Sequence, residues 1–190
     1  MDNIATVPTP RITEEEYPRL ERAAKTKSEF VDGEMFAMSG GTRAYSLLAG
    51  SWIRILGNQL LERNYTVFNS ELRIRTRRTR AYVCPDVSVV CEEPQANRNT
   101  EDLLTNPTVV IEVLSPSNKK YDRGRKFELY REIPSLRDYL LVHSDAVLVE
   151  QHSRQPENWL FREYSGVDSS RHIESIDCTV ALEDVYRSVF

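Results

Sequence analysis

Two short apolar segments constrain the fold of this chain more than any other feature. Residues 87–91 (VSVVC) and 108–114 (TVVIEVL) are nearly all apolar and rich in β-branched side chains. A strand with one solvent-exposed face alternates polar and apolar residues, whereas a strand that is covered on both faces is apolar almost throughout. Both segments are therefore predicted to be central strands. The chain has 190 residues, the length of one domain, and we predict a flexible tail at 1–10 and a single domain at 11–190.

Helical and strand signals alternate along the rest of the chain. Thr13 and Glu16 have the spacing of a capping box before a short helix that ends near residue 24. Asp32-Gly33 between apolar flanks predicts a β-hairpin over 30–36. Further helices are predicted over 42–63 and from 117 or 118 to about 132, and further strands at 65–75, 136–142, 147–152 and 159–164. This order predicts an α/β (α+β) fold with a mixed β-sheet flanked by helices.

The composition excludes several classes of protein. The net charge is −4, which gives no overall attraction to nucleic acid. No apolar stretch approaches the roughly 20 residues of a membrane span, and residues 1–11 lack the features of a secretory signal. We therefore expect a cytoplasmic protein that does not enter membranes. The three cysteines and three histidines lack the spacing of a zinc site, and the cysteines predict no disulfide framework.

Two carboxylates lie where a sheet disfavours them. Glu112 is in the middle of the apolar segment 108–114, and Asp86 directly precedes the segment 87–91. If these strands are neighbours, the two acids converge, and their mutual repulsion is relieved by a hard divalent cation such as Mg²⁺ or Mn²⁺. In the alternative interpretation, Asp86 caps a turn and Glu112 pairs with an arginine.

A positive partner for these acids is available in the predicted helix after Glu112. Lys119, Arg123 and Lys126 follow one another at steps of four and three, the spacing of one helix face. Lys126 precedes Phe127, which is expected to face the core, so its ammonium is within reach of the sheet edge. The alternative is that Lys126 is an exposed partner of Asp122, four residues earlier.

One strongly basic tract stands out at residues 73–80. Five arginines in eight residues have the chemistry to contact a phosphate backbone, and the tract lies between two predicted strands, as an exposed hairpin tip would. The alternative is a solvated loop without a ligand. The arginines of the tract are Arg73, Arg75, Arg77, Arg78 and Arg80.

Four segments of the chain together resemble a known family. They are 29–34 (EFVDGE), 85–87 (PDV), 110–117 (VIEVLSPS) and 121–130 (YDRGRKFELY). In these segments the chain is similar to the Uma two family, which belongs with the restriction-endonuclease-like PD-(D/E)xK nucleases. The resemblance spans about residues 10 to 185 and implies a restriction-endonuclease-like mixed sheet flanked by helices.

The resemblance also implies roles for particular residues. It makes Asp86 and Glu112 metal ligands, together with the backbone carbonyl of Val113. The lysine of the superfamily motif falls at Leu114 in this chain, and Lys126 on the following helix matches the known variation in which that lysine has moved. Glu34 resembles an extra acidic residue that some members place near the metal.

These observations support one leading hypothesis and two rivals. The leading hypothesis is a metal-dependent DNA endonuclease that uses Mg²⁺, with Mn²⁺ as a substitute, and the catalytic residues Asp86, Glu112 and Lys126. The DNA contacts expected for it come from the arginine tract, Lys119 and Arg123, and a homodimer would suit the cutting of two strands. The first rival is a non-catalytic module with the nuclease fold that binds nucleic acid or protein, which is favoured by Leu114 and by Tyr45, where many family members have a histidine. The second is a metal-binding structural protein.

Overall fold

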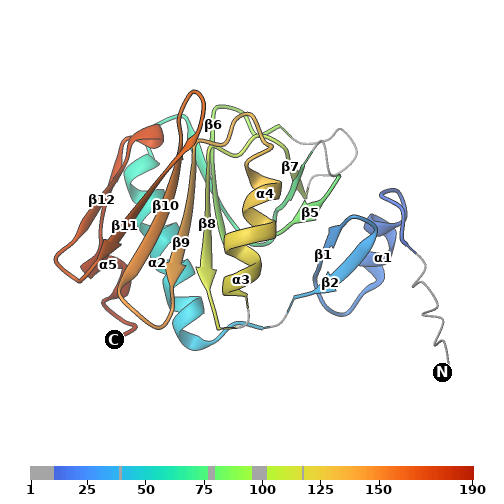
Figure 1. Ribbon diagram of the computed structural model, residues 1–190, viewed down its shortest axis with the longest axis horizontal. Helices are drawn as coiled ribbons and strands as arrows, with labels where there is room; N and C mark the ends of the chain where they lie inside the picture. Colours follow the sequence, from blue (N-terminus) through green and yellow to red (C-terminus); the bar gives the residue numbers. More distant parts are fainter. Residues whose placement is uncertain (1–10, 39, 77–79, 96–101, 117) are drawn as a thin grey trace, which may run out of the picture.

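A computed structural model describes residues 11–38, 40–76, 80–95, 102–116 and 118–190 of the chain. Its centre is a six-stranded sheet in the order β11-β10-β9-β8-β6-β3 (Figure 1). The sheet is mixed, because β8 and β9 are parallel and the other neighbours are antiparallel. Its strands are β3 (Tyr65–Asn69), β6 (Val87–Cys91), β8 (Val109–Leu114), β9 (Asp138–His143), β10 (Leu148–Arg154) and β11 (Trp159–Ser165).

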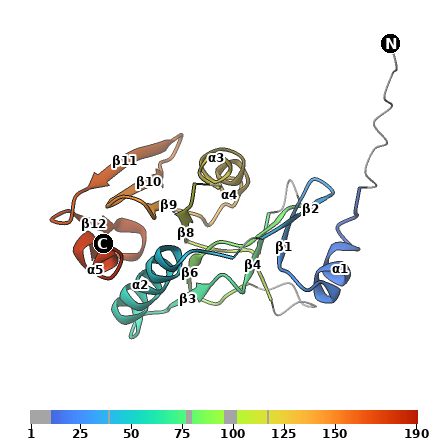
Figure 2. The same cartoon turned by 90° about the horizontal axis from the view of Figure 1, so that it is seen from below.

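Helices cover both faces of this sheet, which confirms the predicted fold class. Helix α2 (Arg43–Leu60) lies on one face, and a helical segment of three parts lies on the other (Figure 2). The three parts are α3 (Lys119–Tyr121), the π-helical turn η1 (Asp122–Lys126) and α4 (Phe127–Tyr130). All six residues of β8 are buried, as the apolar pattern predicts for a central strand.

A second sheet has the order β2-β1-β5-β4-β7 and lies beside helix α1 (Tyr17–Ala23). The predicted hairpin is confirmed, because β1 (Ser28–Val31) pairs with β2 (Glu34–Ala37) and both turn residues have positive φ angles, 52° at Asp32 and 85° at Gly33. These values match the turn in which both central residues are left-handed. The other strands of this sheet are β4 (Arg73–Arg75), β5 (Tyr82–Val83) and β7 (Leu103–Leu104).

The predicted single strand over 65–75 is wrong. It is divided into β3 and β4, which belong to different sheets. A turn separates them, in which the side-chain Oδ1 of Asn69 accepts a hydrogen bond of 3.0 Å from the backbone N–H of Glu71. Asparagine favours such turns because its side chain replaces a backbone acceptor.

The C-terminal part of the chain was not predicted in detail. It forms the hairpin β12 (Ser170–Ile173) and β13 (Cys178–Ala181), the short 3-10 helix η2 (Glu174–Ile176) between them, and helix α5 (Leu182–Tyr186). Buried residues of this part join the core cluster between α2 and the six-stranded sheet. Of the helices in the described residues, none combines the length and apolar character that spanning a membrane requires.

The Asp32-Gly33 turn is a testable element of the fold. We predict that Gly33→Ala lowers the free energy of unfolding by about 1 kcal/mol, because a left-handed φ disfavours a side chain and the new Cβ would lie 3.1 Å from Cβ of Arg11. Gly57→Ala in α2 is the matched control, since no atom lies within 4 Å of its Cβ and alanine favours a helix by about 0.5–1 kcal/mol. Urea unfolding measures both, and a shift of the same sign in the two variants would contradict this geometry.

Candidate functional site

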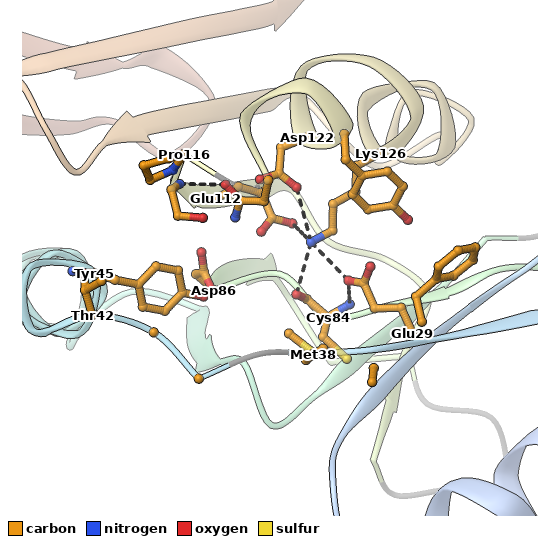
Figure 3. Close-up of a pocket in the computed structure, with 17 residues that line it drawn as sticks. Glu29, Met38, Thr42, Tyr45, Cys84, Asp86, Glu112, Pro116, Asp122 and Lys126 are labelled. Atoms are coloured by element: carbon orange, nitrogen blue, oxygen red, sulfur yellow. Dashed lines mark hydrogen bonds and ion pairs between the residues drawn. The ribbon is translucent and has the colours of Figure 1, made fainter.

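The two sheets and the helical segment meet around one cavity of about 540 Å³ (Figure 3). Four acidic side chains and one lysine from the described residues line it, and apolar residues of β2 and the start of α2 form another part of its wall. The charged residues are Glu29, Asp86, Glu112, Asp122 and Lys126.

Asp86 lies between β5 and β6 and is held by two hydrogen bonds. Its Oδ2 accepts from the backbone N–H of Val113 at 2.6 Å, and its Oδ1 accepts from the hydroxyl of Tyr45. Because β6 pairs with β8, Asp86 and Glu112 line the same cavity, as the sequence predicts for neighbouring strands. The Asp86 side chain is only 4% exposed, and burial raises its pKa to about 6, although Lys126 and the Val113 N–H oppose the shift.

Glu112 points from the middle of β8 toward the helical segment and is 2% exposed. Its Oε1 accepts a hydrogen bond of 2.8 Å from the hydroxyl of Tyr130 and lies 2.9 Å from Nζ of Lys126. The alternative that it pairs with an arginine is therefore wrong, because its cationic partner is a lysine. Burial raises the pKa of this carboxyl well above its ordinary value, Lys126 lowers it, and the charge of Asp86 adds to the rise.

Lys126 is 5% exposed and lies among carboxylates from three elements. Its Nζ is 3.0 Å from Glu29 Oε1 on β1, 2.9 Å from Glu112 Oε1 on β8 and 3.7 Å from Asp122 Oδ1 on its own helical segment. It also donates to the backbone carbonyl of Cys84 at 3.4 Å. The alternative of an exposed pair with Asp122 is wrong: the pair exists, but both residues are buried.

The prediction that Lys119, Arg123 and Lys126 line one helix face is wrong. Lys119 pairs with Asp145 at 2.7 Å, and Arg123 binds the carboxylate of Glu150, so both lie away from the cavity. The reason is the π-helical turn at Asp122–Lys126. It closes hydrogen bonds over five residues instead of four, which rotates Lys126 relative to the residues before the turn.

Glu29, and not Glu34, is the acid of the β1–β2 hairpin that lines the cavity. Glu34 is exposed on β2 and is not among the lining residues, whereas Glu29 is buried and accepts a hydrogen bond of 2.9 Å from the backbone N–H of Cys84. The signal for Glu29 was its place directly before the apolar pair Phe30-Val31, in a strand whose four residues are all buried.

The arginine tract begins on a strand of the hairpin that β4 and β5 form, so Arg73 and Arg75 lie on β4 and not at an exposed tip. Arg73 is buried, pairs with Asp102 and lies with its guanidinium 5.7 Å from the ring centroid of Tyr17. Arg75 donates to the carboxylate of Glu14 at 2.6 Å. Among the described arginines of the tract, Arg80 has an exposed side chain. Its Nε lies 3.6 Å from Oε2 of Glu14. Arg77 and Arg78 lie outside the described residues.

The cavity also contains a buried polar atom that finds no hydrogen-bond partner in the described part of the chain, Oδ2 of Asp122. Four carboxylates against one lysine leave an excess of negative charge, which a hard cation with oxygen ligands would relieve. No three His, Cys, Asp or Glu side chains among the described residues form a metal-binding group by themselves. A cation held by Asp86 and Glu112 would therefore need further oxygens to complete its coordination shell, and the carbonyl of Val113 accepts a hydrogen bond of 3.3 Å from Asn118.

Comparison with known proteins places these features in a wider context. Residues 14–183 match the model of the Uma2 family, described as "Putative restriction endonuclease". The chain is 37% identical over 185 residues to one uncharacterized protein of Synechocystis, covering 97% of this chain and 96% of the relative. It is 35% identical over 156 residues to another protein of that organism, covering 82% of this chain and 88% of the relative.

A solved structure shares the fold. It is a crystal structure from Anabaena variabilis described as "a putative nuclease belonging to DUF820". The two chains superpose with a TM-score of 0.76. The superposition covers 94% of this chain and 99% of the other, and the sequences are 18% identical. The likeness therefore extends over nearly the whole chain at the level of the fold.

The burial of Lys126 generates a prediction about stability. Lys126→Met should lower the free energy of unfolding by about 3–5 kcal/mol at pH 7.5, because it leaves buried carboxylates without their counter-charge. Lys119→Met is the matched control on the same helical segment. Asp145, the partner of Lys119, is half exposed, so Lys119→Met should lower the free energy of unfolding by no more than about 1 kcal/mol. Chemical unfolding of both variants is the measurement, and similar losses would contradict the burial described here.

Asp122 generates a prediction about pH. Burial raises its pKa from 3.8 to about 6, with Lys126 opposing the shift and Glu29 adding to it. The folded state thus holds this proton more tightly than the unfolded state, and the stability that the proton provides is lost as the pH rises from about 4 to 6. Over this range the wild type should lose on the order of 2 kcal/mol of unfolding free energy relative to Asp122→Asn, measured by urea titrations at several pH values. A constant difference between the two proteins would show that Asp122 has an ordinary pKa.

Proposed function

This chain belongs to the Uma2 family, and on that premise we propose that it is a metal-dependent endonuclease that hydrolyses phosphodiester bonds in DNA. The observation that supports this most directly is the cavity in which Asp86 and Glu112 lie beside the buried ammonium of Lys126. Two acids and a lysine that line one cavity are the parts that hydrolysis of a phosphodiester requires.

The position of the lysine supports an active enzyme over an inert module. Leu114, where the superfamily motif has its lysine, is fully buried in the core beneath the helical segment. Lys126 brings an ammonium to 2.9 Å from Glu112 from the other side of the cavity. The loss of a lysine from the strand therefore does not remove the cation from the site.

In the proposed site, Asp86, Glu112 and the carbonyl of Val113 hold the divalent cation. When bound, Mg²⁺ polarises the scissile phosphate and lowers the pKa of a coordinated water. The residues of the chain do the rest. Val113 N–H and the Tyr45 hydroxyl fix the orientation of Asp86, and Lys126 stabilises the negative charge that develops on the phosphate.

For contacts to the DNA backbone we propose Arg80, Lys119 and Arg123, together with Arg77 and Arg78 beyond the described residues. Phosphate contacts of this kind position the nucleic acid without selecting a sequence. Arg73 is not part of this proposal, because its side chain is only 10% exposed and is bound by the carboxylate of Asp102. Arg75, whose side chain is 26% exposed, is a further candidate.

Metal binding tests the first half of the proposal. Isothermal titration of Mn²⁺ should reveal one site in the wild type and none in Asp86→Asn. Tyr45→Phe should weaken binding by about 10- to 100-fold, the usual cost of losing a partner that orients a metal ligand. The matched control is Asp145→Asn, which removes an exposed carboxylate outside the cavity and should bind Mn²⁺ as the wild type does.

Cleavage tests the second half. Supercoiled plasmid and circular single-stranded DNA, incubated with the protein and Mg²⁺, should yield nicked or linear products that Asp86→Asn does not produce. Mn²⁺ binding without cleavage of either DNA would favour the non-catalytic module. If neither binding nor cleavage occurs, the carboxylate cluster has a structural role only.

A further inference from the structure

Phe36 is an aromatic side chain that folding does not explain. It lies on β2, the edge strand of its sheet, and is 45% exposed. Within the described residues it joins none of the buried clusters that form the core. In the hairpin register Phe36 is directly opposite Glu29, and paired residues of antiparallel strands point to the same face. The ring therefore lines the cavity beside the acid that binds Lys126.

The wall of the cavity next to Phe36 is apolar, and its side chains are closely packed. Met38 continues it from β2, and Tyr45 faces it from the first turn of α2, with its hydroxyl on Asp86 (Figure 3). Tyr45 packs against the backbone of Gly41, where a Cβ would lie 2.3 Å from Cδ1 of its ring. Any side chain at residue 41 would displace the ring. The cavity thus has an apolar, aromatic wall directly beside its carboxylates.

The opposite side of the cavity contains a polar atom without a partner. Oδ2 of Asp122 is buried and finds no hydrogen-bond partner among the described residues, and Asp122 is 1% exposed. Buried polar groups normally have a partner, so this side is suited to a ligand with hydrogen-bonding atoms. A ligand that matches both walls has a flat apolar face and a polar edge.

We propose that the cavity holds one unpaired nucleotide of the DNA substrate, with its base against Phe36 and Met38 and its phosphate toward Asp86 and Glu112. This inference rests on the proposed function and adds the substrate class: single-stranded or locally opened DNA. A volume of about 540 Å³ falls within the roughly 300–1,000 Å³ of pockets that enclose small ligands, the size class of a nucleotide.

The physical argument for an unpaired base concerns its faces. Inside a duplex both faces of a base are covered by its neighbours, so stacking on Phe36 requires a base that has left the stack. Aromatic side chains bind such bases whatever their identity, because every base has a π-face. The cavity therefore selects for the unpaired state and not for a sequence.

The experiment compares two forms of one DNA sequence. A fluorescein-labelled 20-nucleotide single strand and the blunt-ended duplex containing it are titrated with protein in Ca²⁺, a hard cation with similar oxygen ligands, and gels verify that the DNA stays intact. The wild type should bind the single strand more tightly. Phe36→Ala should weaken that binding by about 5- to 100-fold, the range for losing one stacked base, with little change for the duplex. Phe161→Ala is the matched control, since this equally exposed aromatic lies on β11, outside the cavity.

Other binding results would contradict either the unpaired nucleotide alone or the nuclease proposal as well. Equal affinity for the two DNA forms, or single-strand binding by Phe36→Ala that matches the wild type, overturns the unpaired nucleotide and leaves the nuclease proposal standing. An equal loss in Phe161→Ala overturns it as well, because the effect would not belong to the cavity. If the folded wild type binds neither DNA form, the nuclease proposal and this inference both fall. Circular dichroism and thermal melting confirm the fold of each variant.

Discussion

The ammonium of Lys126 is the interaction on which the rest of the structure depends. Three carboxylates from separate elements surround it: Glu29 on β1 of the second sheet, Glu112 on β8 of the central sheet, and Asp122 on the helical segment. Isolated charges are expensive to bury, so each of these groups is stable in its place only because the others are there. The ammonium of Lys126 therefore connects the two sheets and the helical segment at one point, and this point is in the wall of the cavity.

The excess of buried acids over lysine in this cluster lowers the stability of the fold, which indicates that the cluster has a function. Counting Asp86, four acids share one lysine, and burial raises the pKa of Asp86 and of Asp122 to about 6. A fold selected for stability alone would replace such a cluster with apolar side chains, since buried ionic groups seldom stabilise more than a well-packed core does. The excess of acid is consistent with a site whose remaining charge is neutralised by something it binds.

The parts of the fold and site that sequence predicts are those determined by local chemistry. The composition of residues 108–114 is enough to predict a buried strand with Glu112 in its middle, and Asp32-Gly33 is enough to predict the hairpin turn. Features that depend on distant partners escape such reasoning. Arg73 is buried because Asp102 neutralises it, and the inward rotation of Lys126 depends on a π-helical turn. Glu34 shares a face of the hairpin with Glu29 but lies beside the turn, two residue pairs away from it, and only Glu29 lines the cavity.

The location of the lysine on a helix also has consequences for the core. On β8, residue 114 is free to be a leucine, which is fully buried in the cluster that includes Leu129 and Tyr130 of the helical segment. The helix that supplies the ammonium thus shares a buried cluster with Leu114 of the strand. Tyr130 strengthens this link, because its ring packs in the same cluster while its hydroxyl donates to Glu112. Core packing and the geometry of the cluster around Lys126 are therefore coupled through one helix, and a change in the core beneath it would move Lys126 relative to the carboxylates.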